Sequence, residues 1–342
     1  MKKDKKVRKY FDPDKVIDSS SNETDVPKLS GPETEELGPS AMILPDGCVY
    51  IGQFDGDLPH GEGILRWPDL SERFVGIFEK GNPKRGTLFL ENKDCYEGEF
   101  RGGVYHGDGS LQLFDGRKFV GEFFAGEFVK GKSYSQNSGS YEGGFKNGVY
   151  HGAGTLYAHD GKTFIGEFQD GEFVKGRIYC ANSDRYEGGF KGGFYHGSGT
   201  LCSHDGQKWI GEFHIGEFVK GRIYFTNSDW YEGRLSNGLY EGYGTYAFCC
   251  GEKYVGYFRE GKYHGQGNLR YSDGSSHEGE FENDRFVGNG AGIYRWPDGS
   301  YYVGEFRNGE FHGEGTVFDA DGSVSYSGRY VYGALVKQYP VD

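Results

Sequence analysis

The sequence predicts an all-β protein: an elongated, single-layer antiparallel meander of about thirteen stacked β-hairpins that follows a disordered N-terminal tail. Glycine supplies 61 of the 342 residues and aromatic residues supply 17%. Because each interior glycine costs a helix about 1 kcal/mol relative to alanine, strands and turns should dominate. In addition, one short motif recurs at a nearly constant spacing, which is typical of a stacked repeat architecture.

The first 40 residues differ from the rest of the chain. Residues 1–40 lack hydrophobic periodicity and are rich in Ser, Pro, Asp, Glu and Lys. Such a segment cannot bury enough apolar surface to offset the entropy lost on ordering, so we predict a disordered tail. Residues 1–10 carry six Lys or Arg against one Asp, whereas residues 11–40 carry two Lys against eight acidic residues. A basic tip therefore precedes an acidic stem.

Residues 44–342 form one repeat array. Its motif is an aromatic residue, any residue, Gly, any residue and a second aromatic residue, and successive copies start 22 to 25 residues apart. His277 and the Leu235 of "YEGRL" depart from this pattern. Up to about residue 230 the units alternate in pairs of 45 residues, and later units are more uniform. The copies start at Tyr50, Phe74, Tyr96, Phe119, Tyr141, Phe164, Tyr186, Trp209, Tyr231, Tyr254, His277, Tyr302 and Tyr326.

Each unit reads as a β-hairpin. In "TFIGEF" the period of two places Phe164, Gly166 and Phe168 on one face of a strand. The glycine leaves a notch between two rings, and we expect an aromatic ring from a neighbouring strand to lie over it. An isolated hairpin is marginally stable in water, so the hairpins must stack. Two strands per unit at about 4.8 Å each predict a rod on the order of 120 Å long before twisting.

The stretch "YEGGFKNGVYHGAGTLYAHDG" at 141–161 resembles a MORN repeat, the membrane occupation and recognition nexus unit. The resemblance extends over the whole array. It implies elongated hairpin ribbons, often dimeric, that act as scaffolds in cilia and flagella, at the cytoskeletal cortex and at membrane contacts. A homodimer is therefore one expectation. Such repeats also accompany lipid kinases and a methyltransferase, but neither a kinase nor a SET domain is recognisable here.

The net charge, the cysteine pattern and the hydropathy of the sequence limit the kinds of partner and the cellular compartment that we expect. A net charge of −13 disfavours a nucleic-acid partner, which would require a basic surface. The six cysteines include no CxxC pair, and no apolar run suits a secretory signal or a membrane span. We therefore expect a cytoplasmic protein with reduced thiols. The adjacent pair Cys249 and Cys250 is interpreted as an irregularity of a strand.

No chemistry of an enzyme is predicted. Histidines of the HGxG motifs recur 45 or 46 residues apart in the alternating part, about four strands or roughly 19 Å, too far to share a metal ion. We expect their rings to bond to turn backbone instead. The GxG strings are not followed by helices and do not suit phosphate binding. We predict no catalytic residue, no metal and no cofactor.

The alternation of "YHGAG" with "FVKGR" produces a basic ladder. Its residues either balance nearby glutamates through weak cross-strand pairs, or bind an extended anionic surface such as acidic protein tails or anionic lipid heads. The candidate residues are a first row, Arg85, Lys130, Lys175 and Lys220, and a second row, Lys132, Arg177 and Arg222.

The leading functional hypothesis is a non-catalytic scaffold of a ciliary or flagellar (axonemal) or cortical cytoskeletal assembly, with cytoskeletal or axonemal proteins as partners. This placement depends on the resemblance alone. The alternative is a peripheral membrane adaptor that binds anionic phospholipids through the ladder and the basic tip. A regulatory subunit of a separate lipid kinase is a third hypothesis.

Overall fold

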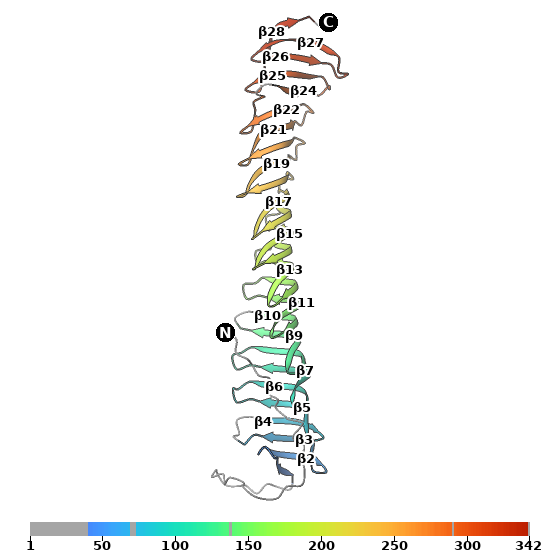
Figure 1. Cartoon of the computed structure of the whole chain (residues 1–342), viewed down its shortest axis with the longest axis vertical. Coiled ribbons are helices and arrows are strands. Elements are labelled where there is room, and N and C mark those ends of the chain that lie inside the picture. Colours follow the sequence, from blue (N-terminus) through green and yellow to red (C-terminus); the bar gives the residue numbers. More distant parts are fainter. Residues whose placement is uncertain (1–39, 69–72, 137–138, 289–290, 341–342) are drawn as a thin grey trace. The chain divides into compact units, whose positions relative to one another are not determined.

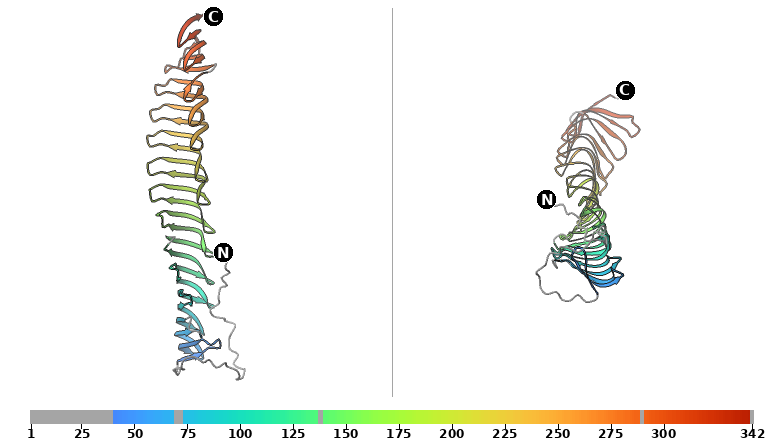
Figure 2. Two further views of the ribbon diagram at one scale, coloured as in Figure 1. Left: turned by 90° about the vertical axis from the view of Figure 1, so that its left-hand side faces the viewer. Right: turned by 60° about the horizontal axis from the view of Figure 1, so that its bottom comes forward.

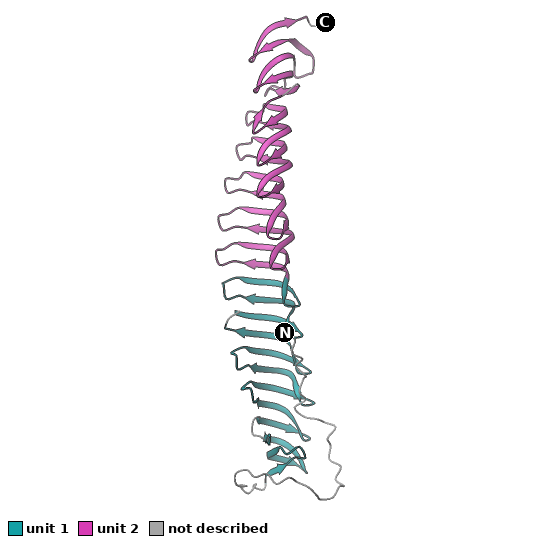
Figure 3. Ribbon diagram, turned by 60° about the vertical axis from the view of Figure 1, so that its left-hand side comes forward, with its two compact units in different colours: residues 1–173 teal, residues 174–342 magenta. Residues whose placement is uncertain are grey.

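The computed structural model describes residues 40–68, 73–136, 139–288 and 291–340. The predicted tail, except for residue 40, lies outside the described residues. The chain divides into two compact units, residues 1–173 (unit 1) and residues 174–342 (unit 2), shown in Figure 3. Each unit is described by itself below.

Every regular element in the described residues is a β-strand, and within each unit the strands follow one another in a single layer (Figures 1 and 2). Unit 1 contains β1 (Ala41–Ile43), β2 (Val49–Asp55), β3 (Leu58–Arg66), β4 (Arg73–Glu79), β5 (Asn82–Phe89), β6 (Cys95–Arg101), β7 (Val104–Gln112), β8 (Lys118–Phe124), β9 (Glu127–Ser135), β10 (Gly139–Lys146), β11 (Val149–Tyr157) and β12 (Thr163–Gln169). The strand β13 (Glu172–Tyr179) begins in unit 1 and ends in unit 2. Unit 2 continues with β14 (Arg185–Lys191), β15 (Phe194–Cys202), β16 (Lys208–His214), β17 (Glu217–Tyr224), β18 (Trp230–Ser236), β19 (Leu239–Ala247), β20 (Lys253–Arg259), β21 (Lys262–Arg270), β22 (Ser276–Glu282), β23 (Arg285–Phe286), β24 (Gly292–Arg295), β25 (Tyr301–Arg307), β26 (Glu310–Phe318), β27 (Val324–Val331) and β28 (Ala334–Tyr339).

The predicted antiparallel meander of hairpins is confirmed, and each predicted motif start lies in the first strand of a hairpin. The hairpin of β10 and β11 shows the local rule. Its turn residues Asn147 and Gly148 have φ angles of 52° and 77°, which is the left-handed pair that a two-residue type I′ turn requires. Strand β1 pairs with β2 and so precedes the predicted start of the array at residue 44.

A row of glycines crosses the sheet in each unit, with one glycine from each of successive strands, and we call it the glycine row. Its members pair directly across neighbouring strands, and the sheet backbones approach closely there because no side chain intervenes. In unit 1 the successive partners are Gly52, Gly63, Gly76, Gly86, Gly98, Gly109, Gly121, Gly131, Gly143, Gly154 and Gly166. In unit 2 Gly176, Gly188, Gly199, Gly211, Gly221 and Gly233 pair in the same way.

A tyrosine ring covers each glycine pair in the hairpins that start with tyrosine. A Cβ added to Gly143 or Gly154 would lie 2.4 or 2.3 Å from the Tyr141 hydroxyl oxygen. The prediction of a ring from the neighbouring strand is therefore wrong for the motif glycine Gly143, whose ring comes from its own strand, and the same ring covers its partner Gly154 on the next strand. The reason is that Tyr141 lies on the same face two residues earlier and donates a 3.2 Å hydrogen bond to the carbonyl of Gly144.

The rings build a continuous aromatic layer on one side of each sheet, the inner face. Tyr141 is 1% exposed and stacks on Tyr150 with a centroid distance of 3.9 Å. Phe145 and Phe168 meet it edge-on at 5.2 and 5.1 Å, an arrangement that aromatic quadrupoles favour. The opposite side of the sheet, the outer face, carries the side chains that alternate along each strand with the rings of the inner face.

The unit that starts at His277 is irregular. Strand β22 pairs with both the short β23 and β24. The ring of Phe286 lies where the tyrosine ring lies in other hairpins: its atoms would be 3.0 Å from a Cβ added to Gly279 and 2.8 Å from one added to Gly292. The replacement of tyrosine by histidine is thus compensated by a ring from the second part of the same hairpin.

Candidate functional site

The second row of the predicted basic ladder is paired within the protein. Each base lies directly opposite a glutamate of the next strand on the outer face. Exposed pairs of this kind contribute a few tenths of a kcal/mol, so they mainly balance charge. Lys132 meets Glu142 at 3.2 Å, Arg177 meets Glu187 at 3.0 Å, and Arg222 contacts Glu232.

The first row is exposed on the same face. In unit 1 Lys130 lies opposite Glu122 in the register, and in unit 2 Lys220 lies opposite Glu212. Arg85 similarly lies opposite Glu99. The outer face therefore presents both signs of charge side by side, and the ladder is not a purely basic strip. Whether these residues bind an anionic partner stays a prediction.

Apolar side chains on the outer face were not singled out from the sequence. Exposed valine or isoleucine recurs every 45 residues beside the glycine row, and exposed aromatic rings recur with the same spacing nearer the connecting turns. The alternation within "TFIGEF", which directs Ile165 away from the two rings, was the signal that could have revealed them. They are Val75, Val120, Ile165 and Ile210, with Phe89, Tyr134, Tyr179 and Tyr224.

Two grooves lie along the glycine row on the outer face. The groove in unit 1 has a volume of about 500 Å³ and includes Arg85, Thr87, Glu97, Asp108 and Val120 among its lining residues. The groove in unit 2 has a volume of about 490 Å³, with Ser198, Thr200, Ile210, Glu212 and Lys220. Both mix charged, hydroxyl and apolar groups, a composition that suits a polypeptide better than a simple anion.

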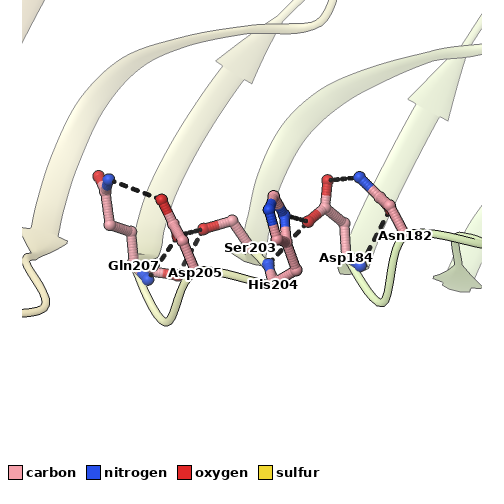
Figure 4. A network of polar contacts seen from close by, with 6 residues as sticks. All are labelled: Asn182, Asp184, Ser203, His204, Asp205 and Gln207. Atoms are coloured by element: carbon pink, nitrogen blue, oxygen red, sulfur yellow. Dashed lines mark hydrogen bonds and ion pairs between the residues drawn. The ribbon is translucent and has the colours of Figure 1, made fainter.

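Polar networks fix the turns that join successive hairpins (Figure 4). The Asp184 carboxylate accepts the backbone N–H of His204 at 2.7 Å and the side chain of Asn182 at 2.8 Å. These bonds, the His204 backbone bond foremost, lower the pKa of Asp184. Ser203 donates to Asp205, while the His204 ring faces Asp184 at 3.1 Å. The neighbouring Ser, His and Asp therefore form turn contacts and not a catalytic relay.

The histidines of the HGxG motifs lie partly buried beside the turns. Nδ1 does not make the expected hydrogen bond from ring to turn backbone in His60, His151, His196 and His312, where this atom is buried without a hydrogen-bond partner. A bond from the other ring nitrogen stays a prediction. The described residues contain no group of three or more His, Cys, Asp or Glu side chains that could hold a metal ion. In the same part of the chain no helix is long and apolar enough to cross a membrane.

His277 should make stability depend on pH. Burial among Phe286, Tyr294 and Phe306 lowers its pKa to about 4. As the pH falls, His277 takes up a proton near pH 6.5 in the unfolded chain but only near pH 4 in the folded chain. The free energy of unfolding therefore decreases as the pH drops from about 6.5 to about 4. Because His277 is partly exposed, solvent screens part of this effect. We expect the free energy of unfolding to be about 1 to 2 kcal/mol lower at pH 5 than at pH 7.

Urea unfolding of the wild type and of His277→Phe at both pH values measures this difference. The variant should show a smaller change between pH 7 and pH 5, whatever its absolute stability. An equal change in both proteins would show that His277 is not the responsible group.

The fold and its repeated surface define a single-layer β-hairpin repeat protein. The MORN repeat model matches residues 50–72, 96–116, 141–163, 186–208, 231–249, 254–276, 277–301 and 302–324. These matches cover more than half of the chain, which therefore belongs to the MORN-repeat family. This membership fits a scaffold that binds proteins.

The chain has only weak similarity to individual solved structures. No curated protein matches the chain significantly. The TCP domain of Drosophila melanogaster SAS-4 (dCPAP), solved in complex with a proline-rich motif of Ana2 (dSTIL), is similar at 14% identity and a TM-score of 0.25, over 51% of this chain and 82% of that one. A mutant of the TCP10 domain of Danio rerio CPAP is similar at 9% identity and a TM-score of 0.17, over 85% and 99%. Scores at this level carry no functional argument.

Proposed function

We propose that the chain is a non-catalytic scaffold of a ciliary, flagellar or cortical cytoskeletal assembly, and that its outer face binds protein partners. The observation that carries the proposal is the repetition of one surface. In unit 1 Val75, Val120 and Ile165 recur at every fourth strand, roughly 19 Å apart, beside charged side chains of both signs. A surface with this repeat suits an extended protein segment that makes similar contacts more than once.

The membrane adaptor receives less support. A lipid surface favours uncompensated basic clusters, whereas the bases Lys132, Arg177 and Arg222 each have a glutamate partner within the protein. The basic tip at residues 1–10 lies outside the described residues, so any contribution from it stays a prediction.

A triple substitution on the outer face tests the proposal. Val75→Glu, Val120→Glu and Ile165→Glu place charge on side chains of unit 1 that are 37% to 43% exposed, so folding should tolerate them while apolar partner contacts are lost. We expect the tagged variant to leave the cytoskeletal structure that the wild type occupies in a ciliated or flagellated cell.

The matched control is Ile215→Glu, which changes a side chain of 57% exposure in the turn between β16 and β17, outside both strands. This control should keep the wild-type position. Normal localisation of the triple variant, with its fold verified by circular dichroism, would remove the outer face as the docking surface.

A further inference from the structure

Cys249 and Cys250 occupy the centre of the turn between β19 and β20. The interpretation of this pair as an irregularity within a strand is wrong, because β19 ends at Ala247 and β20 begins at Lys253. Phe248 donates its backbone N–H to Glu252 at 2.8 Å, and Gly251 closes the turn with a φ of 94°. Both cysteines are exposed, so the turn presents two adjacent thiols to solvent.

Equivalent turns use aspartate or asparagine where this one has Cys250. In each of them the side-chain oxygen accepts the backbone N–H two residues later and so caps the turn. A thiol is a poor substitute for this acceptor, and folding alone would favour aspartate or asparagine at Cys250. The capping residues are Asp46, Asp115, Asp160, Asp205, Asp273, Asp298 and Asp321, with Asn92, Asn182 and Asn227.

The backbone of Cys249 is held in place from the preceding turn. Its N–H donates to the Asp229 carboxylate at 2.8 Å, as that of His204 does to Asp184. Asp229 is 5% exposed and also accepts from Tyr246 at 3.0 Å.

The spacing of the two thiols favours a shared ligand over a disulfide. Adjacent Cα atoms across a trans peptide are about 3.8 Å apart, below the roughly 4.4 Å minimum of ordinary disulfides. A central atom that forms a bond of about 2.3 Å to each sulfur holds the two sulfurs farther apart than a direct S–S bond does, so adjacent cysteines can bind it together. The described residues offer no third His, Cys, Asp or Glu ligand around it, which disfavours a closed tetrahedral zinc site and suits a soft centre of low coordination number.

We propose that Cys249 and Cys250 form a dithiol site that chelates one soft, thiophilic centre, such as a monovalent copper ion or a trivalent arsenical. With an arsenoxide, two As–S bonds form, and the two thiol protons leave with the arsenoxide oxygen as one water. No oxidation or reduction takes place. Chelation by two sulfurs is reversed by a competing dithiol and resists a monothiol.

The test uses the reduced, full-length protein and phenylarsine oxide as the probe. One equivalent should protect both Cys249 and Cys250 from iodoacetamide, as read from peptide masses, and dithiothreitol but not mercaptoethanol should restore alkylation. Cys250→Asp supplies the capping carboxylate of the turns that use aspartate and should abolish the protection while keeping the fold. The control Cys95→Ser removes a distant thiol and should bind like the wild type.

Two results would overturn the site. Protection of other cysteines in place of this pair would show that the probe binds elsewhere. Undiminished binding by Cys250→Asp would show that the two thiols do not act together. A Cys249→Ser variant that also loses protection supports the site independently of the turn cap.

Discussion

Replacing Gly154 with valine should destabilise the surrounding hairpins by about 3 kcal/mol, because overpacking of a closely packed site typically costs 1 to 3 kcal/mol. The added Cβ alone would lie 2.3 Å from the Tyr141 hydroxyl oxygen and 2.5 Å from its Cζ. Since each hairpin contacts mainly its sequence neighbours, the loss should concentrate in β10 to β12. Hydrogen exchange of these strands, together with urea unfolding, measures it.

Two further variants separate the ring contact from a general effect of replacing glycine. Gly148→Asn changes a turn glycine with a φ of 77° and no neighbouring atom within 4 Å of an added Cβ; asparagine tolerates this conformation and should cost little. Tyr141→Leu combined with Gly154→Val should be less destabilising than the sum of the single changes. Strict additivity would refute the contact between ring and glycine.

Tyr231→Ala should destabilise the protein by about 3 to 5 kcal/mol, the range for removing a large buried ring. Tyr231 is 0% exposed, stacks on Tyr240 at 3.9 Å and donates a 2.8 Å hydrogen bond to the carbonyl of Arg234. Its removal empties the space over Gly233 and also removes the hydrogen bond to that carbonyl. Urea unfolding and exchange in β18 to β20 report the change.

Tyr243→Ala is the matched control on the same hairpin. This tyrosine is 62% exposed on the outer face, and surface substitutions usually change stability by less than about 0.5 kcal/mol. Similar losses in the two variants would mean that buried rings do not govern the stability of the array.

The hairpins could be predicted because local chemistry repeats thirteen times. Turn pairs such as Asn147 and Gly148 and the alternation in "TFIGEF" specify strands and register within each unit. The source of the ring over Gly143 could not be predicted in this way. Periodicity assigns a side chain to a face, but it does not say whether a ring bends along its own strand or across to the next.

The outer face was only half predictable. The sequence spacing placed Lys132, Arg177 and Arg222 in one row, and each of them lies on the outer face of its own unit. Their glutamate partners depend on the pairing of different hairpins, which spacing within a repeat does not reveal. The absence of a capping side chain at Cys250 likewise depends on the conformation of its turn, which the motif spacing does not specify.

Extraction of the tagged wild-type protein from a ciliated or flagellated cell with a non-ionic detergent tests the proposed scaffold most directly. Detergent dissolves membranes but leaves axonemal and cortical cytoskeletal assemblies intact, so a protein-bound scaffold should stay in the insoluble fraction and keep its position there. Release of the protein together with membrane lipids and lipid-anchored markers would contradict the scaffold and favour the membrane adaptor.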